Sequence, residues 1–282
     1  MWRGDLMRNR SAFPTDAHRD SFLEFETALL AEVARVEAAV WSATGTQAAA
    51  NPCVATPDLS RFEWSVFSQD GIDGVLEAIF HAPGFVPPKA RLYVEIGTQT
   101  AHECNTRLLR QKWNWSGLML DDDEENAYVN LQRATVGPWN INALLGLAGM
   151  PRDFDLLSID IDGMDALVWL AIDDSRFHPR VVVVEAYPYR GDVVHLYPGD
   201  SPGTSYEAFV RIGRAKGYSL VAGPGAELPG TTNLVFVRDE LRSCLPVLNV
   251  SGSTIPRKIS RTTATRLLES KWVPYLRGPD VP

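Results

Sequence analysis

The chain is poor in cysteine. Only three cysteines occur among its 282 residues, and Cys53, Cys104 and Cys244 lie far apart in the sequence. Three scattered thiols supply neither a disulfide framework nor a cysteine-rich metal site. Reduced thiols, as in proteins of the cytoplasm, are therefore expected.

Long apolar runs and an excess of basic charge are also missing. No stretch approaches the roughly twenty apolar residues that a membrane-spanning helix needs, and residues 1–16 contain no apolar segment like that of a secretory signal. The 27 Lys and Arg are outnumbered by 35 Asp and Glu, so the formal net charge is −8. This balance disfavours nucleic acids and anionic lipids as partners. We expect a soluble cytoplasmic protein that binds neither.

What the chain does have is the composition of an ordinary globular domain, with 45% hydrophobic and 22% charged residues. Its length suffices for one large domain with its own core. We expect a helical extension over residues 1–60, an α/β domain over residues 61–242, and a tail over residues 243–282 packed on that domain. The extension centres on an amphipathic helix over residues 20–42. Its apolar stripe predicts contact with the substrate side of the domain or with a second subunit of a homo-oligomer.

Strands and helices alternate along the α/β domain. Apolar, β-branched runs predict strands over residues 91–96, 118–120, 154–161, 180–185, 218–221 and 232–237. Amphipathic runs predict helices over residues 73–81, 101–112, 124–132, 140–148, 166–171 and 205–216. Such alternation predicts a parallel sheet covered by helices on both faces.

The ends of the predicted strands are acidic. In an open parallel sheet, ligands bind beyond the carboxyl ends of the strands. Here these ends carry Glu95, Asp121–Asp123, Asp160–Asp162 and Glu185. Residues 97–101 read Gly-Thr-Gln-Thr-Ala, so the G-x-G-x-x-G pattern of dinucleotide-binding proteins is absent. Acidic strand ends suit a hydroxyl-rich or cationic ligand better than a pyrophosphate.

Two carboxylate groups each permit two interpretations. A carboxylate of Asp121–Asp123 can accept the hydroxyls of a ribose, or the run can cap the helix expected from Glu124. Alternation along a strand places Asp160 and Asp162 on one side, beside Glu185 of the neighbouring strand. Crowded carboxylates need a cation, a shared proton or N–H donors. The second group is therefore either a ligand or metal site, or a helix-capping arrangement.

A long polar connection over residues 187–200 follows the strand that ends at Glu185. Loops of this length at a ligand-binding edge often contact substrate. Tyr187, Tyr189, Arg190 and His195 are the candidate acceptor-binding residues, and His195 is the one that titrates near neutral pH. An ordered surface flap is the alternative.

Four segments taken together resemble the class I S-adenosylmethionine-dependent methyltransferases. They are residues 67–71 (FSQDG), 94–107 (VEIGTQTAHECNTR), 155–165 (DLLSIDIDGMD) and 180–185 (RVVVVE). The resemblance extends over residues 62–242. It implies a Rossmann-like sheet of seven mostly parallel strands, with helices on both faces and the last strand inserted antiparallel. The implied reaction is SN2 methyl transfer from S-adenosylmethionine to a small polar acceptor, such as a hydroxyl of a natural product or sugar in secondary metabolism.

The same resemblance implies roles for single residues. Those implied to bind the donor are Glu95, Gly97, Thr98, Asp121, Asp122 and Asp160. Asp121 or Asp122 would hold the ribose, and Asp160 would lie near the methionine moiety or the acceptor. Some relatives bind Mg²⁺ at the ends of the fourth and fifth strands, where this chain has Asp160, Asp162 and Glu185.

Catalysis and two other functions follow from these roles. If the acceptor is a hydroxyl, Asp160 and His195 are the candidate catalytic residues, because one of them would take its proton. A scaffolding module that keeps the fold without efficient donor binding is an alternative, supported by Thr98-Gln99-Thr100 in place of the usual glycine-rich sequence. A reaction other than methyl transfer from the same donor is another.

Overall fold

The computed structural model describes residues 31, 59–81, 86–187, 194–195, 203–223, 232–242 and 245–248. Apart from Ala31, the helix expected over residues 20–42 lies outside these residues, and so does the tail beyond residue 248. The division of the chain at residues 60 and 242 stays a prediction. Among the helices that the structure describes, none combines the length and the apolar character needed to cross a membrane.

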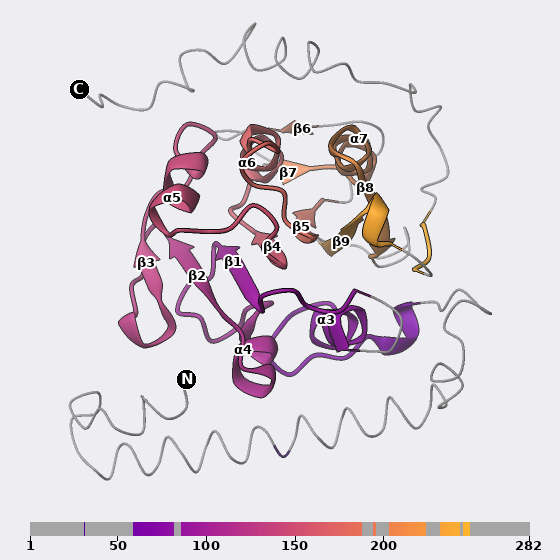
Figure 1. The fold of residues 1–282 in the computed structure, drawn as a ribbon, viewed down its shortest axis with the longest axis horizontal. Coiled ribbons are helices and arrows are strands. Elements are labelled where there is room, and N and C mark those ends of the chain that lie inside the picture. The colour runs from indigo at the N-terminus through magenta and orange to yellow at the C-terminus, as the bar shows by residue number, and fades with distance from the viewer. Residues whose placement is uncertain are drawn as a thin grey trace, which may run out of the picture.

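The described residues form one large sheet in the order β3-β2-β1-β4-β5-β9-β8 (Figure 1). The strands are β1 (Leu92–Ile96), β2 (Ser116–Asp121), β3 (Leu131–Arg133), β4 (Leu156–Ile159), β5 (Val181–Ala186), β8 (Tyr218–Ala222) and β9 (Thr232–Arg238). The first five run parallel, whereas β9 is antiparallel to both β5 and β8. The expected Rossmann-like sheet of seven mostly parallel strands is confirmed, including its antiparallel insertion.

Helices cover both faces of this sheet, as expected (Figure 1). On one face lie α3 (Ile72–His81) and α4 (Arg107–Trp113), and on the other lie α5 (Ile141–Leu147), α6 (Asp165–Ala171) and α7 (Tyr206–Lys216). The four consecutive valines of β5 show why this strand is central. Val181 and Val183 pack into the first layer, Val182 and Val184 into the second, and all four are fully buried.

The helix predicted over residues 124–132 is wrong. The segment contains a single 3₁₀ turn, Ala127–Val129, and then enters β3. Asn126 is extended and its side chain accepts the N–H of Tyr128, while Asn130 adopts a left-handed conformation with φ 54°. Asparagine makes such local bonds readily, and they compete with a continuous helix.

The helix predicted over residues 101–112 starts later than expected. Its first helical residue is Arg107, because Ala101 has a left-handed φ of 61° and Asn105 and Thr106 direct their N–H groups at the carboxylate of Glu95. The six residues before α4 therefore form a loop beyond β1.

The strand order creates a switch point between β1 and β4. From β1 the chain passes outward to β2 and β3, and then returns to β4 on the other side of β1. The connections that leave the carboxyl ends of β1 and β4 therefore diverge, which opens a crevice for a ligand at this edge.

Candidate functional site

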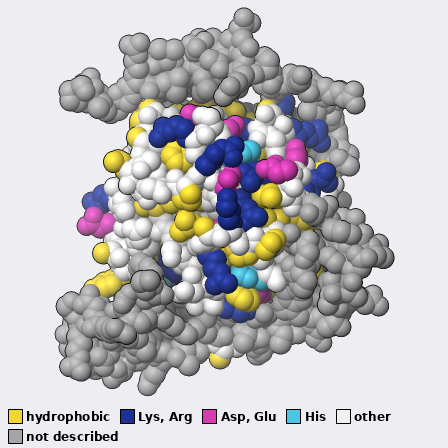
Figure 2. Space-filling view, in the orientation of Figure 1, with side chains coloured by type: hydrophobic (Ala, Val, Ile, Leu, Met, Phe, Trp, Pro, Cys, Tyr) yellow, Lys and Arg dark blue, Asp and Glu magenta, His cyan; other side chains and the backbone are white. Residues whose placement is uncertain are grey.

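A cavity of about 730 Å³ lies at this edge, beyond the carboxyl ends of β1, β2, β3 and β4. Its volume falls in the range of small-molecule sites, about 300–1,000 Å³. The apolar lining comes from Ile96, Leu120, Ala134, Val136, Ile161 and Met164, and the acidic lining from Asp121, Asp122, Asp123, Glu124, Asp160 and Asp162. None of the described lining residues is Lys, Arg or His. Basic side chains gather instead on the face seen in Figure 2, with acidic ones among them.

Gly97 begins the loop that forms one wall of the cavity. It has φ +80°, and a Cβ atom there would lie 1.5 Å from the carbonyl oxygen of Asp160. Only glycine permits this contact between the ends of β1 and β4. Gln99 and Ala101 also adopt left-handed conformations, with φ 45° and 61°. The loop thus has the backbone of a glycine-rich turn although two of its three left-handed residues carry side chains, at a cost of roughly 1–2 kcal/mol each.

Asp121 holds this loop against the next one. Its Oδ2 accepts the N–H of Gln99 at 2.7 Å, and its Oδ1 accepts those of Asp123 and Glu124 at 3.1 and 3.2 Å. Both oxygens are therefore engaged by the backbone. The predicted capping interpretation applies to Asp121, although it caps a turn and not a helix.

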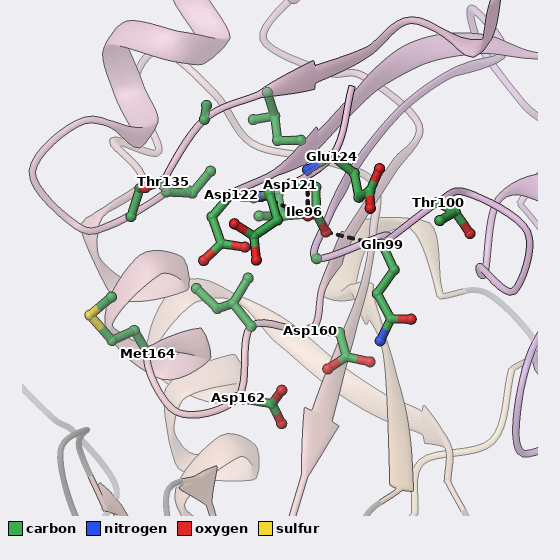
Figure 3. A pocket seen from close by; sticks show the side chains of 16 residues that line it. Ile96, Gln99, Thr100, Asp121, Asp122, Glu124, Thr135, Asp160, Asp162 and Met164 are labelled. Carbon is green, nitrogen blue, oxygen red and sulfur yellow. Dashed lines mark hydrogen bonds between the residues drawn. The ribbon is translucent and has the colours of Figure 1, made fainter. Parts of the chain in front are cut away.

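Of Asp121 and Asp122, it is Asp122 whose carboxylate is left for a ligand. It is exposed, lines the cavity, and accepts no hydrogen bond from the described residues. Figure 3 shows its side chain directed into the cavity, whereas Asp121 points toward Gln99. Of the two candidates for a ribose, the geometry favours Asp122.

Glu95 and Thr98 do not line the cavity in the described part of the chain. Glu95 is buried, and its oxygens accept the N–H groups of Asn105 at 2.6 Å and Thr106 at 3.1 Å. Burial raises its pKa, which these bonds partly oppose. Thr98 is buried as well. Glu95 thus stabilises the loop between β1 and α4 through these hydrogen bonds. The side chains of Glu95 and Thr98 are both buried outside the cavity lining.

Asp160, Asp162 and Glu185 converge as the sequence predicts. Each contributes a carboxylate oxygen, and these oxygens lie within 4.8 Å of one another. The reason differs from the expected strand alternation, because β4 ends at Ile159 and both aspartates lie on the following loop. Asp162 reaches the cluster through a left-handed turn with φ 53°. There it accepts the hydroxyl of Tyr187 at 3.0 Å.

The electrostatics of this carboxylate cluster (Asp160, Asp162 and Glu185) are strained. Burial, followed by the charges of Glu185, Asp165 and Asp162, raises the pKa of Asp160 to about 9. At neutral pH and without a cation, Asp160 and Glu185 therefore share a proton. Three convergent carboxylates are also the oxygen ligands that Mg²⁺ prefers. The cluster fits either a proton or a hard divalent ion.

Sequence reasoning missed the role of Asp165. This fully buried residue accepts the N–H groups of Ile161 at 2.9 Å and Gly163 at 3.0 Å, and burial raises its pKa to about 6. It fixes the turn that carries Asp162. Asp165 begins α6, but it accepts N–H groups from residues before it in the chain and does not cap the helix, so no helix-capping pattern marks it in the sequence.

The connection after β5 is described only in part. The backbone of His195 lies in β6 (Val194–His195), paired antiparallel with β7 (Gly203–Thr204). Gly203 packs against the ring of Tyr187, where a Cβ would lie 2.1 Å from a ring carbon. The side chain of His195, and all of Tyr189 and Arg190, lie outside the described residues. The predicted roles of these three residues remain predictions.

Comparisons with known proteins give only distant structural likenesses. No protein-family model and no curated protein sequence matches the chain. Solved structures similar to it include the pyocyanin biosynthetic protein PhzM, with 16% identity, 58% of this chain and 56% of that chain covered, and a TM-score of 0.32. Another is the O-methyltransferase NcsB1 from neocarzinostatin biosynthesis, in complex with S-adenosylmethionine and a naphthoic acid. It has 13% identity, 53% of this chain and 49% of that chain covered, and a TM-score of 0.34.

A third similar structure is the 1,6-didemethyltoxoflavin-N1-methyltransferase of Burkholderia thailandensis, with 11% identity, 59% of this chain and 78% of that chain covered, and a TM-score of 0.38. The chain matches about half the length of PhzM and NcsB1. The fold is class I methyltransferase-like. This description rests on the strand order with its antiparallel β9, and likenesses at such TM-scores carry no argument.

Proposed function

We propose that the protein is an S-adenosylmethionine-dependent methyltransferase that acts on a small polar acceptor. The observation that carries the proposal is the cavity at the switch point between β1 and β4, bounded by the left-handed loop at 97–101. The loop keeps the backbone of a glycine-rich turn at an energetic cost. Strain that persists at a ligand-binding edge supports a binding function over an idle scaffold.

The cavity has matching places for the parts of this donor. Its apolar side, with Leu120, Val136 and Met164, suits the flat face of a purine, and the free carboxylate of Asp122 suits the two hydroxyls of a ribose. When bound, S-adenosylmethionine supplies a methyl group that is already activated on a sulfonium. The protein then has to align an acceptor with that methyl group and exclude competing water.

An acceptor hydroxyl also has to lose its proton. An ionised carboxylate of the cluster can accept it, and Asp160 is the member that both lines the cavity and contacts Glu185. Asp160 keeps a proton at neutral pH when no cation is near. Mg²⁺ held by Asp160, Asp162 and Glu185 would displace that proton and lower the pKa of an acceptor hydroxyl beside it, and a carboxylate oxygen that the metal leaves unbound would then accept the hydroxyl proton. We propose a hydroxyl acceptor and Mg²⁺ on these grounds, with His195 as the alternative base.

Donor binding is tested by isothermal calorimetry with S-adenosylmethionine and S-adenosylhomocysteine. We expect both to bind, and Asp122→Ala to weaken binding by about 1–3 kcal/mol because a charged hydrogen-bond acceptor is lost. Glu125→Ala is the matched control, since Glu125 is exposed nearby and does not line the cavity. Absence of heat and of a thermal shift at millimolar ligand would favour the scaffolding function.

The metal is tested by turnover. Release of S-adenosylhomocysteine is measured with a panel of phenolic and polyhydroxylic acceptors, before and after addition of a chelator. Turnover should fall with the chelator and return with Mg²⁺. An unchanged rate would exclude the metal and leave the carboxylate cluster as a proton acceptor only.

A further inference from the structure

The segment FSQDG at residues 67–71 lies at a place that the cavity does not include. Asp70 adopts a left-handed φ of 54°. Its Oδ2 accepts the backbone N–H of Asn233 at 3.1 Å and the side-chain N–H of the same residue at 3.5 Å. Asn233 lies directly opposite Glu185 in the pairing of β5 with β9. A single residue therefore separates Asp70 from the carboxylate cluster, and Asp70 is not among the described residues that line the cavity.

A chain of hydrogen bonds fixes the position of Asp70. The side-chain oxygen of Asn233 accepts the side-chain N–H of Asn105 at 3.3 Å, and the same group of Asn105 donates to the hydroxyl of Ser158 at 3.0 Å. Asn105, Ser158 and Asn233 are all buried, whereas Asp70 is exposed. Its Oδ1 accepts no hydrogen bond from the described residues. Buried polar side chains thus hold an exposed carboxylate, with one oxygen available, close to the cluster.

Tyr206 reaches the same end of β5 from another element. It is the first residue of α7, and Ser205 before it forms a bridge with Tyr187, the residue that follows β5. The hydroxyl of Tyr206 is buried and has no hydrogen-bond partner among the described residues. Burial, followed by the negative charge of Asp70, raises the pKa of this hydroxyl. The hydroxyl is therefore protonated at neutral pH and lies within electrostatic reach of Asp70.

Asp70 and Tyr206 are complementary groups without a hydrogen bond between them. A carboxylate only accepts hydrogen bonds, whereas a protonated phenol can donate one. A buried hydroxyl without a partner costs about 1–3 kcal/mol, so a ligand group that accepts from Tyr206 would bind favourably. An ammonium group would suit Asp70, but it offers no acceptor to Tyr206. A ligand hydroxyl satisfies both, because it donates to the carboxylate and accepts from the phenol.

We infer that Asp70 and Tyr206 are specificity-determining residues that bind a second hydroxyl of a polyhydroxylated, sugar-like acceptor. The inference rests on the proposed function and deepens it. The hydroxyl that receives the methyl group lies at the carboxylate cluster, and the second hydroxyl binds beyond Asn233. An acceptor with a single hydroxyl occupies the first place only, so the pair selects polyhydroxylated acceptors over simple phenols.

The experiment compares two probes that differ in their number of hydroxyls, methyl β-glucopyranoside and phenol. Their binding to the full chain is measured by saturation-transfer NMR, in the presence of S-adenosylhomocysteine and Mg²⁺. We expect the glycoside to bind, and Tyr206→Phe and Asp70→Asn each to weaken it about three- to tenfold, because one hydrogen bond is lost or weakened. Phenol binding should not change. Tyr128→Phe is the matched control, because Tyr128 is 41% exposed before β3, outside the described cavity lining, and should affect neither probe.

The affinity for S-adenosylhomocysteine, measured by calorimetry, separates this selectivity from a structural role. It should be the same in the unaltered protein and in both variants, since neither Asp70 nor Tyr206 is among the described lining residues. A variant that also loses S-adenosylhomocysteine would show that its residue supports the fold, which overturns the inference.

Three results with the probes would also overturn it. They are an unaltered protein that does not bind the glycoside, variants that bind the glycoside as tightly as the unaltered protein, and equal losses for glycoside and phenol. The second result would show that water alone lies between Asp70 and Tyr206. All three leave the proposed function intact, whereas an unaltered protein that does not bind S-adenosylhomocysteine would overturn that function and the inference with it.

Discussion

The two ends of the β4–β5 pair differ in their charged residues, which are of opposite sign at the amino ends and of the same sign at the carboxyl ends. At the amino ends, Asp155 precedes β4 and Arg180 precedes β5. The two form an ion pair at 2.8 Å. Asp155 is fully buried and also accepts the N–H groups of Lys89 at 2.6 Å and Ala90 at 2.8 Å. Both charges of this pair are compensated within the protein.

At the carboxyl ends the same two strands bring together charges of one sign. Asp160 follows β4, Glu185 lies near the end of β5, and none of the described ion pairs includes Asp160. Burial, together with the repulsion between these carboxylates, raises the pKa of Asp160. The comparison teaches that one end stabilises the fold, while the other leaves its compensation to a proton or a ligand.

The largest expected effect comes from breaking the compensated end. Asp155→Asn removes the negative charge beside buried Arg180 and weakens the acceptor for several backbone N–H groups. An unpaired buried charge costs about 3–5 kcal/mol, so the free energy of unfolding should fall by that amount in urea titrations. Glu240→Gln is the control, because its side chain is 59% exposed and its partner Arg238 keeps a second ion pair, with Asp153, so the loss should be less than about 1 kcal/mol. Equal losses in the two variants would contradict the comparison.

At the carboxyl ends, removal of a carboxylate should stabilise the protein and not destabilise it. The pKa of Asp160 is higher in the folded chain, about 9, than in the unfolded chain, about 4. The folded protein therefore holds this proton more tightly, and the free energy of unfolding decreases as the pH rises from about 4 to about 9. Asp160→Asn removes that loss and keeps a donor for Glu185. The free energy of unfolding of the variant should exceed that of the unaltered protein by about 2 kcal/mol at pH 9, and the two should not differ near pH 4.

The same variant separates stability from activity. Asp160→Asn should lower turnover more than it lowers donor affinity, because the donor is held mainly by the loops after β1 and β2. A variant that is destabilised at pH 9 would show that the carboxylate cluster is already compensated in the folded protein. A fully active variant would show that its role is structural.

The sequence predicted the sheet well because its signals are local. The valines of β5 and the apolar runs of the other strands identify buried strands without knowledge of their neighbours, and the resemblance supplied their number and the antiparallel insertion of the last one. The helix predicted over residues 124–132 failed because Asn126 and Asn130 make local bonds that a hydrophobic pattern does not register.

The site was predicted less completely because its decisive contacts are tertiary. Adjacent aspartates look alike in a sequence, and only the fold shows that Asp121 accepts the N–H of Gln99 while Asp122 faces the cavity. Likewise, the missing glycine at Gln99 predicted an impaired loop. The structure shows that the left-handed backbone is retained there, because a hydrogen bond to Asp121 of β2 holds it.

The smallest expected effect concerns a single hydrogen-bond donor to the carboxylate cluster. The hydroxyl of Tyr187 donates to Asp162 at 3.0 Å, and burial together with the nearby carboxylates raises its pKa, so it remains a donor at working pH. Tyr187→Phe should therefore lower the free energy of unfolding by about 0.5–1.5 kcal/mol at pH 8. In an Asp162→Asn background most of this loss should disappear, because the charge that the hydroxyl compensates is gone. If the loss is the same in both backgrounds, Tyr187 stabilises the protein through its packing on Gly203. The hydrogen bond from Tyr187 then does not compensate the negative charge of the carboxylate cluster.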